Sequence, residues 1–154
     1  MNIELDLIHA HQVLSARQIT VTGWVDPLVV ERGWHAGDER TLRYLTPSLG
    51  PTATLMLHRL GGNAHHDSVW TPGELAATFG LSAGGEHGEL GRNSPTCRSL
   101  ARLVQFGFAR LGATSISIRT HIAPLSERHL RRLPGYLVTE YLRELQRQTT
   151  RSPA

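Results

Sequence analysis

Hydrophobic and polar residues follow one another along this chain in short blocks, many of them closed by glycine or proline. From residue 49, apolar residues recur at intervals of three and four and stop at Gly61-Gly62-Asn63, which predicts a helix. Val69-Trp70 reads as a very short strand. A second helix is predicted from Thr71 to Phe79, because Thr71 and Glu74 have the spacing of a capping box.

A third helix and a β-hairpin are predicted next. Asn93-Ser94-Pro95 is a helix start, and the helix from Pro95 to about Phe106 has two faces. The apolar face carries Cys97, Leu100, Ala101, Leu103 and Val104. The polar face, expected to be an exposed stripe, carries Thr96, Arg98, Ser99, Arg102 and Gln105. The turn Gly112-Ala113-Thr114 then joins two short strands within residues 108–122.

The first 48 residues predict several short elements. Alternating apolar residues at 3–7 and at 18–23 are typical of short strands, which can pair as a hairpin. Asp26-Pro27 begins a short helix that Gly33 can end. Asp38 can cap another helix through Leu45, stopped by Pro47.

The C-terminal part predicts two more helices. The first begins at Ser126 and ends at Leu133, before Pro134. The second runs from Gly135 to about Gln148, and residues 149–154 are expected to be frayed. Its apolar stripe includes Val138, Tyr141, Leu142 and Leu145, which predicts packing within the chain or against a second copy as a homodimer.

Positive charge is concentrated in one segment. All sixteen basic residues are arginine, whose planar fork of donors suits phosphates and guanine edges. Residues 92–132 hold eight arginines and one acid, a formal charge of +7, whereas residues 1–48 carry −2 and residues 49–91 carry −3. This distribution indicates a polyanion-binding surface, although a solvated basic face without a partner remains the alternative.

The order from residue 49, helix, short strand, helix, helix, hairpin, resembles the winged helix-turn-helix family of DNA-binding domains. The resemblance implies an α+β, mainly helical fold. It divides the chain into an N-terminal extension (1–48), a winged-helix module (49–125), C-terminal helices (126–148) and a tail (149–154). The helix at 71–79 looks like the supporting helix, the helix at 95–106 the recognition helix, and the hairpin at 108–122 the wing.

Independently of this resemblance, the residue types around the third helix suit contacts with a nucleic acid. A helix N-terminus offers free backbone N–H groups to a phosphate, and polar residues along the following turns can reach base edges. Arginines on the hairpin could straddle a phosphate backbone. The predicted DNA-binding residues are Arg92, Asn93, Ser94, Thr96, Arg98, Ser99, Arg102, Gln105, Arg110 and Arg119.

Other chemistries find little support in the sequence. The glycine-containing loop at 81–92 is longer than a usual helix-turn-helix turn and lacks the Gly-Lys-Ser/Thr of a nucleotide-binding loop. His65-His66-Asp67, His87 and Cys97 lack metal-ligand spacing, and Cys97 falls on an apolar face. Glu86 and Glu89 read as solvated acids. No enzyme, cofactor or metal site is therefore predicted.

We expect a cytoplasmic location, because a single cysteine fits a reducing compartment and no apolar run approaches the length of a membrane span. The acidic start, with Glu4 and Asp6, does not resemble a secretory signal. The leading hypothesis is a transcriptional regulator that binds duplex DNA. Two alternatives are a protein-interaction adaptor on a winged-helix scaffold, and a winged helix that binds RNA.

Overall fold

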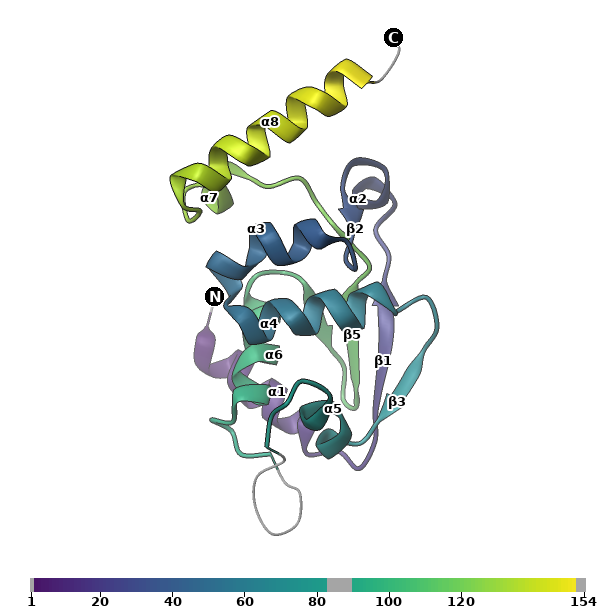
Figure 1. Ribbon diagram of the computed structural model, residues 1–154. Helices are drawn as coiled ribbons and strands as arrows, with labels where there is room; N and C mark the ends of the chain where they lie inside the picture. Colours follow the sequence, from purple (N-terminus) through teal and green to yellow (C-terminus); the bar gives the residue numbers. More distant parts are fainter. Residues whose placement is uncertain (1, 83–89, 152–154) are drawn as a thin grey trace.

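The computed structural model describes residues 2–82 and 90–151. It contains a four-stranded sheet against which several helices pack (Figure 1). Its strand order is β3 (Ser68–Trp70), β1 (Ile19–Trp24), β5 (Ser115–Arg119), β4 (Ala109–Leu111). The pair β1–β5 is parallel, and β1–β3 and β4–β5 are antiparallel. The fold is α+β and more than half helical, as the sequence predicts.

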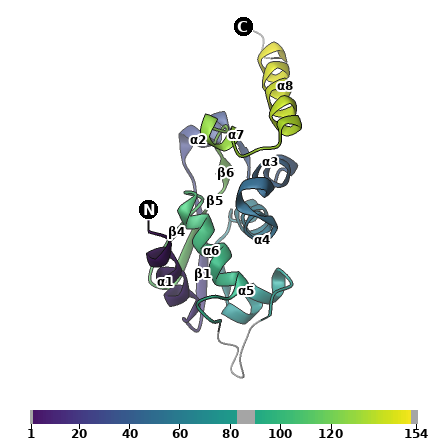
Figure 2. The ribbon, with the colours of Figure 1, turned by 90° about the vertical axis from the view of Figure 1, so that its left-hand side faces the viewer.

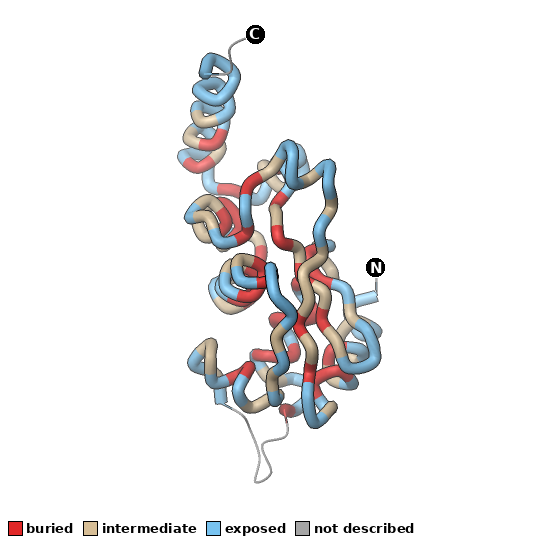
Figure 3. The backbone as a smooth tube through the Cα atoms, turned by 90° about the vertical axis from the view of Figure 1, so that its right-hand side faces the viewer, coloured by how far each residue is buried: buried red, intermediate tan, exposed pale blue. Residues whose placement is uncertain are grey.

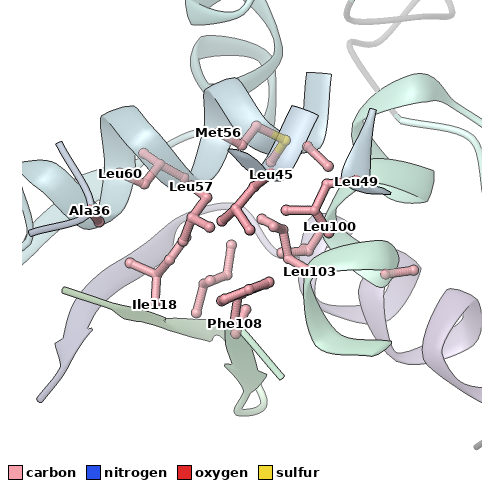
Figure 4. Close-up of a cluster of buried hydrophobic side chains, with 14 of the residues drawn as sticks. Ala36, Leu45, Leu49, Met56, Leu57, Leu60, Leu100, Leu103, Phe108 and Ile118 are labelled. Carbon is pink, nitrogen blue, oxygen red and sulfur yellow. The ribbon is translucent and has the colours of Figure 1, made fainter. Parts of the chain in front are cut away.

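One face of this sheet is covered by helices. The helix α4 (Pro51–Met56) continues as a π-helical turn, η1 (Leu57–Gly61), that lies against β5, and α6 (Pro95–Gln105) packs between α4 and α1 (Ile3–Leu14). Leu57, Leu103 and Ile118 meet in the resulting core (Figure 4). The close approach of η1 to β5 needs a glycine, because a side chain at Gly61 would collide with the carbonyl of Arg119.

A second, smaller assembly lies above the sheet in Figure 1. There β2 (Trp34–His35) pairs antiparallel with β6 (His121–Ile122). The remaining helices are α2 (Pro27–Arg32), α3 (Glu39–Leu49), α5 (Pro72–Thr78), α7 (Glu127–Leu130) and α8 (Gly135–Arg151).

The signals for β3, α5, α6 and the hairpin are confirmed, except that the second hairpin strand ends at Arg119 and His121–Ile122 pair with β2 instead of continuing it. Val69-Trp70 lies in β3, and Thr71 and Glu74 form the reciprocal capping box at the start of α5. The Ser94 hydroxyl accepts the Cys97 N–H at the start of α6. The hairpin β4–β5 also forms, with Ile116 and Ile118 buried in alternation with half-exposed polar residues.

The predicted N-terminal hairpin is wrong. Residues 3–14 form the helix α1, capped by Asn2, whose side-chain oxygen accepts the N–H groups of Glu4 and Leu5. Its buried residues are Ala10, Val13 and Leu14, a helical spacing, whereas the alternation at its first turns lies on exposed or half-buried positions. The strand β1 forms as predicted, but its partners are the distant strands β3 and β5.

Two helices extend beyond their predicted ends. α3 continues through Pro47 to Leu49. Proline lacks the N–H that would reach the Arg43 carbonyl, but the burial of Leu45 and Leu49 on either side holds the helix together. The last helix, α8, reaches Arg151, three residues beyond the predicted end at Gln148 and into the segment expected to be frayed.

The first turns of α8 are anchored to the body of the protein, and its remaining turns protrude (Figure 1). Leu137 and Tyr141 are buried, and the Tyr141 hydroxyl accepts the backbone N–H of Leu125 at 2.8 Å. Arg43 on α3 forms ion pairs with Glu140 at 2.7 Å and Glu144 at 3.4 Å. Beyond Glu144, every described residue of α8 is exposed.

We predict that Tyr141→Phe destabilises the protein, because it leaves the buried N–H of Leu125 without an acceptor. The expected loss is about 1–3 kcal/mol in the free energy of unfolding, measured by urea denaturation. Tyr136→Phe is the matched control, since Tyr136 is 71% exposed and its change should be neutral. Equal stability of the two variants would contradict the role given to the Tyr141 hydroxyl.

Candidate nucleic-acid interface

The predicted recognition helix α6 presents only a narrow strip to solvent. Arg98 and Arg102 are exposed, and Gln105 is half-buried. All three line a groove of about 350 Å³, whose other walls are the N-terminal half of α1 and the junction of α3 with α4. Figure 2 shows α6 from this side, between α1 and α4.

The two arginines of the strip differ in their surroundings. The Arg102 guanidinium donates to the carbonyl of Leu49 at 3.2 Å, at the C-terminal end of α3. Arg98 has no hydrogen-bond or ion-pair partner within residues 2–82 and 90–151. Arg102 is therefore oriented by the protein, whereas Arg98 is held only by its position on the helix.

Two members of the predicted polar stripe are not exposed. Thr96 is fully buried and Ser99 is 8% exposed, so the expectation that they form part of a solvent-facing stripe is wrong. α6 is enclosed on two sides, because it packs against both α1 and α4; on the α1 side the Cys97 thiol lies 3.6 Å from the Leu7 carbonyl. Thr96 is therefore removed from the candidate DNA contacts, and Ser99 contributes only a small area at the wall of the groove.

The start of α6 is polar and accessible, as the sequence suggests, but it is not a free cationic end. Asn93 is exposed, and the side chain of Ser94 is committed to capping the helix. Arg92 forms an exposed ion pair with Glu4 of α1 at 3.3 Å. Glu4 therefore offsets part of the positive potential at this end of the strip.

Arg110 and Arg119 lie on a different surface. Both project from the face of the sheet opposite to Ile116 and Ile118, which contact the helical layer. Their guanidinium carbons lie 3.8 Å and 3.7 Å from the ring of Trp24, and Arg119 also donates to the Gly107 carbonyl and pairs with Asp26. Figure 3 shows the strands from the side opposite to the view of Figure 2. The sheet thus separates these arginines from the α6 strip.

The structure brings one more arginine, Arg132, to the C-terminal end of the strip. Phe106 follows Arg102 by four residues, and the guanidinium carbon of Arg132 lies 5.2 Å from its ring. His129 of α7 stacks on Phe106 at 6.4 Å and on Phe108 at 6.5 Å. The arginines at 128–132 contribute to the positive charge of residues 92–132, but the sequence does not predict that any of them lies near α6. Nothing in the spacing of the residues indicates the contact of α7 with Phe106.

The position of His129 between these groups lowers the pKa of its imidazole. Burial lowers the pKa of its imidazole below the ordinary value of 6.5, and the nearby positive charges of Arg132 and Arg128 lower it further. The neutral ring is therefore the form that fits between the aromatic residues and the arginines.

Other candidate chemistries gain no support from the geometry. No group of three or more His, Cys, Asp or Glu side chains that could hold a metal ion is found in the described part of the chain. His65 and His66 are exposed, and burial raises the pKa of the Cys97 thiol. His87, Glu86, Glu89 and most of the glycine loop lie outside the described residues. None of the described helices is both long and apolar enough to cross a membrane.

Comparisons of the chain with protein-family models, with curated proteins and with solved structures found no match.

We predict that His129 makes stability fall in acid. Because its folded pKa lies below the unfolded value of 6.5, unfolding takes up a proton, so the free energy of unfolding decreases as pH falls below about 6.5. The pKa of His121 is lowered too, by burial and by His35, so His129→Gln should reduce this decrease without abolishing it. Urea denaturation from pH 7.5 to 5 measures both slopes, and identical slopes would refute the assignment.

Proposed function

We propose that this protein binds duplex DNA through the exposed strip of α6 and acts in the cytoplasm as a transcriptional regulator. One observation carries the proposal: Arg98 and Arg102, one helical turn apart, face solvent without a carboxylate partner in the part of the chain that the structure describes. Two guanidinium groups at this spacing suit the phosphates and guanine edges of a duplex.

The winged-helix architecture is part of this proposal, and the order of elements supports it. α4 with η1, β3, α5, α6 and the hairpin β4–β5 follow one another in the order of that family. The insertion of β1 between β3 and β5 is an addition, since this strand comes from the segment before the proposed module. The described bounds of α5 and α6 leave the connection between them longer than a tight turn.

The strip can contact DNA in a defined way. A residue rises about 1.5 Å along a helix, so Arg98 and Arg102 are about 6 Å apart along the axis, and Gln105 lies one turn further. Arg102, oriented by the Leu49 carbonyl, is the more rigid contact, and Arg98 can adapt to a base edge or a phosphate. The outer face of the sheet, with Arg110 and Arg119, is not part of this contact.

We predict that Arg98→Ala with Arg102→Ala abolishes binding to mixed duplex DNA and that Arg98→Ala alone weakens it by about 1–3 kcal/mol, because each arginine supplies a charge-assisted contact. Gel-shift titration at low salt measures both. Arg110→Ala is the matched control, since it removes an exposed arginine from the opposite face. Undiminished affinity of the double variant would contradict the proposal.

Two further measurements separate the remaining alternatives. Competition between duplex DNA and structured RNA distinguishes a DNA-binding from an RNA-binding protein. Selection of bound fragments from random duplex DNA distinguishes a specific regulator, which enriches a motif, from a non-specific binder. A purified protein that ignores duplex DNA even at low salt would instead be an adaptor for other proteins.

A homodimer through α8 is a second proposal, favoured by the exposed apolar residues of its protruding turns. Leu142 is 46% exposed and Leu145 is 37% exposed, and with half-buried Val138 they form a stripe spaced by four and three residues. Residues beside the stripe, such as Thr139 and Gln146, are uncharged, so a second α8 can approach without burying a charge. Tyr141, expected in this interface, is buried within its own chain instead.

We predict that Leu142→Glu with Leu145→Glu converts a dimer to a monomer, because it would place four carboxylates between the paired helices. Sedimentation over a range of protein concentrations measures the mass. Thr150→Glu adds a charge on α8 away from the stripe and should leave the mass unchanged. A wild-type protein that is monomeric at all concentrations would overturn the dimer and leave the DNA proposal standing.

A further inference from the structure

We propose that α7 is the second contact of this DNA interface, with Arg128 and Arg132 binding backbone phosphates beyond the C-terminal end of α6. The inference rests on the proposed function and assigns to α7 the contact with the DNA backbone that the winged-helix resemblance assigns to the hairpin. Three observations support it: Arg132 lies on Phe106 at the end of α6, His129 of α7 stacks on two aromatic rings, and Arg128 and Arg132 have no carboxylate partner in the described part of the chain.

The strip on α6 leads to α7 through Phe106. Arg98, Arg102 and Phe106 are each four residues apart and lie on one side of the helix. Arg132 then covers the ring of Phe106, its guanidinium carbon 5.2 Å from the ring centre. α6 and α7 face the same side of the molecule (Figures 1 and 2), so a duplex lying on α6 meets α7 next.

The position of α7 is fixed by aromatic contacts. His129 is nearly parallel to Phe106 and to Phe108, with angles of 20° and 25° between the rings. Ser126 caps the helix by accepting the N–H of His129. The arginines on either side of His129 are therefore presented from a supported turn, which lowers the entropy lost when they bind a phosphate.

The three arginines in and just after α7 differ in whether they already form an ion pair. Arg131 forms an exposed ion pair with Glu127 at 3.8 Å. Arg128 and Arg132 are exposed, and neither has a carboxylate partner among the residues described. Both lie close enough to His129 to act on its imidazole. Two guanidinium groups that have no carboxylate partner, at the end of a basic strip, suit the binding of phosphates.

A phosphate contact from α7 would also add to the few that α6 can make. The helix is 11 residues long, about 16 Å, and Arg92, three residues before its start, is already paired with Glu4. Phosphate contacts fix the orientation of a protein on DNA, and one short strip supplies few of them. The opposite face of the sheet cannot contribute to the same duplex, which leaves α7 as the adjacent basic element.

The experiment is a salt titration of binding to a fluorescein-labelled mixed-sequence duplex of about 25 base pairs, followed by anisotropy. It compares wild type with Arg128→Ala/Arg132→Ala. Losing two phosphate contacts should lower affinity at least ~10-fold near 0.1 M salt and reduce the slope of log K against log salt by about 1.8. Because phosphates carry no sequence information, a second duplex of different sequence should show the same loss.

Arg131→Ala is the matched control, since it removes an arginine from the same turn that is already paired within the protein. It should leave the slope unchanged. If Arg98→Ala/Arg102→Ala abolishes binding while Arg128→Ala/Arg132→Ala keeps the wild-type slope, the inference about α7 is overturned and the proposed function stands. If the wild-type protein does not bind duplex DNA at low salt, both fail. Circular dichroism of each variant verifies that the exposed substitutions leave the fold intact.

Discussion

The parallel pairing of β1 with β5 is the interaction on which the rest of this structure depends. Five residue pairs, from Thr20–Ser115 to Trp24–Arg119, join the start of the chain to a hairpin almost a hundred residues later. The other edge of β1 pairs with β3, so the strand is hydrogen-bonded on both sides. Its inward residues Ile19 and Val21 extend the apolar floor formed by Ile116 and Ile118, on which η1 and α6 pack.

This pairing also decides which parts of α6 remain accessible. The chain enters β1 directly from α1, so placing β1 at the centre of the sheet brings α1 alongside α6. α6 packs against α1 and α4, and with Thr96 and Ser99 buried the five-residue polar face is reduced to the strip of Arg98, Arg102 and Gln105. The basic surface of α6 is therefore narrow.

The sheet separates two groups of arginines that look alike in the sequence. Arg110 and Arg119 are directed to the outer face by the alternation of β4 and β5, where both lie against Trp24 and stabilise the strand that carries it. Arg132 lies further along the chain, yet its guanidinium lies against Phe106 at the end of α6, where His129 stacks with Phe106 and Phe108. Arg110 is thus nearer to α6 in the sequence than Arg132 is, but Arg132 is the one that lies against the end of the helix.

The sequence alone determined the local elements and their signals. Capping by Thr71 and Ser94, the turn at 112–114 and the alternation of Ile116 with Ile118 are set by residues within a few positions of one another, and each forms as predicted. Tertiary structure decided the partners of β1, the helical state of residues 3–14 and the burial of Thr96 and Ser99. Those outcomes depend on contacts between segments far apart in the chain, and a local pattern of polar and apolar residues does not specify which distant segment will cover it.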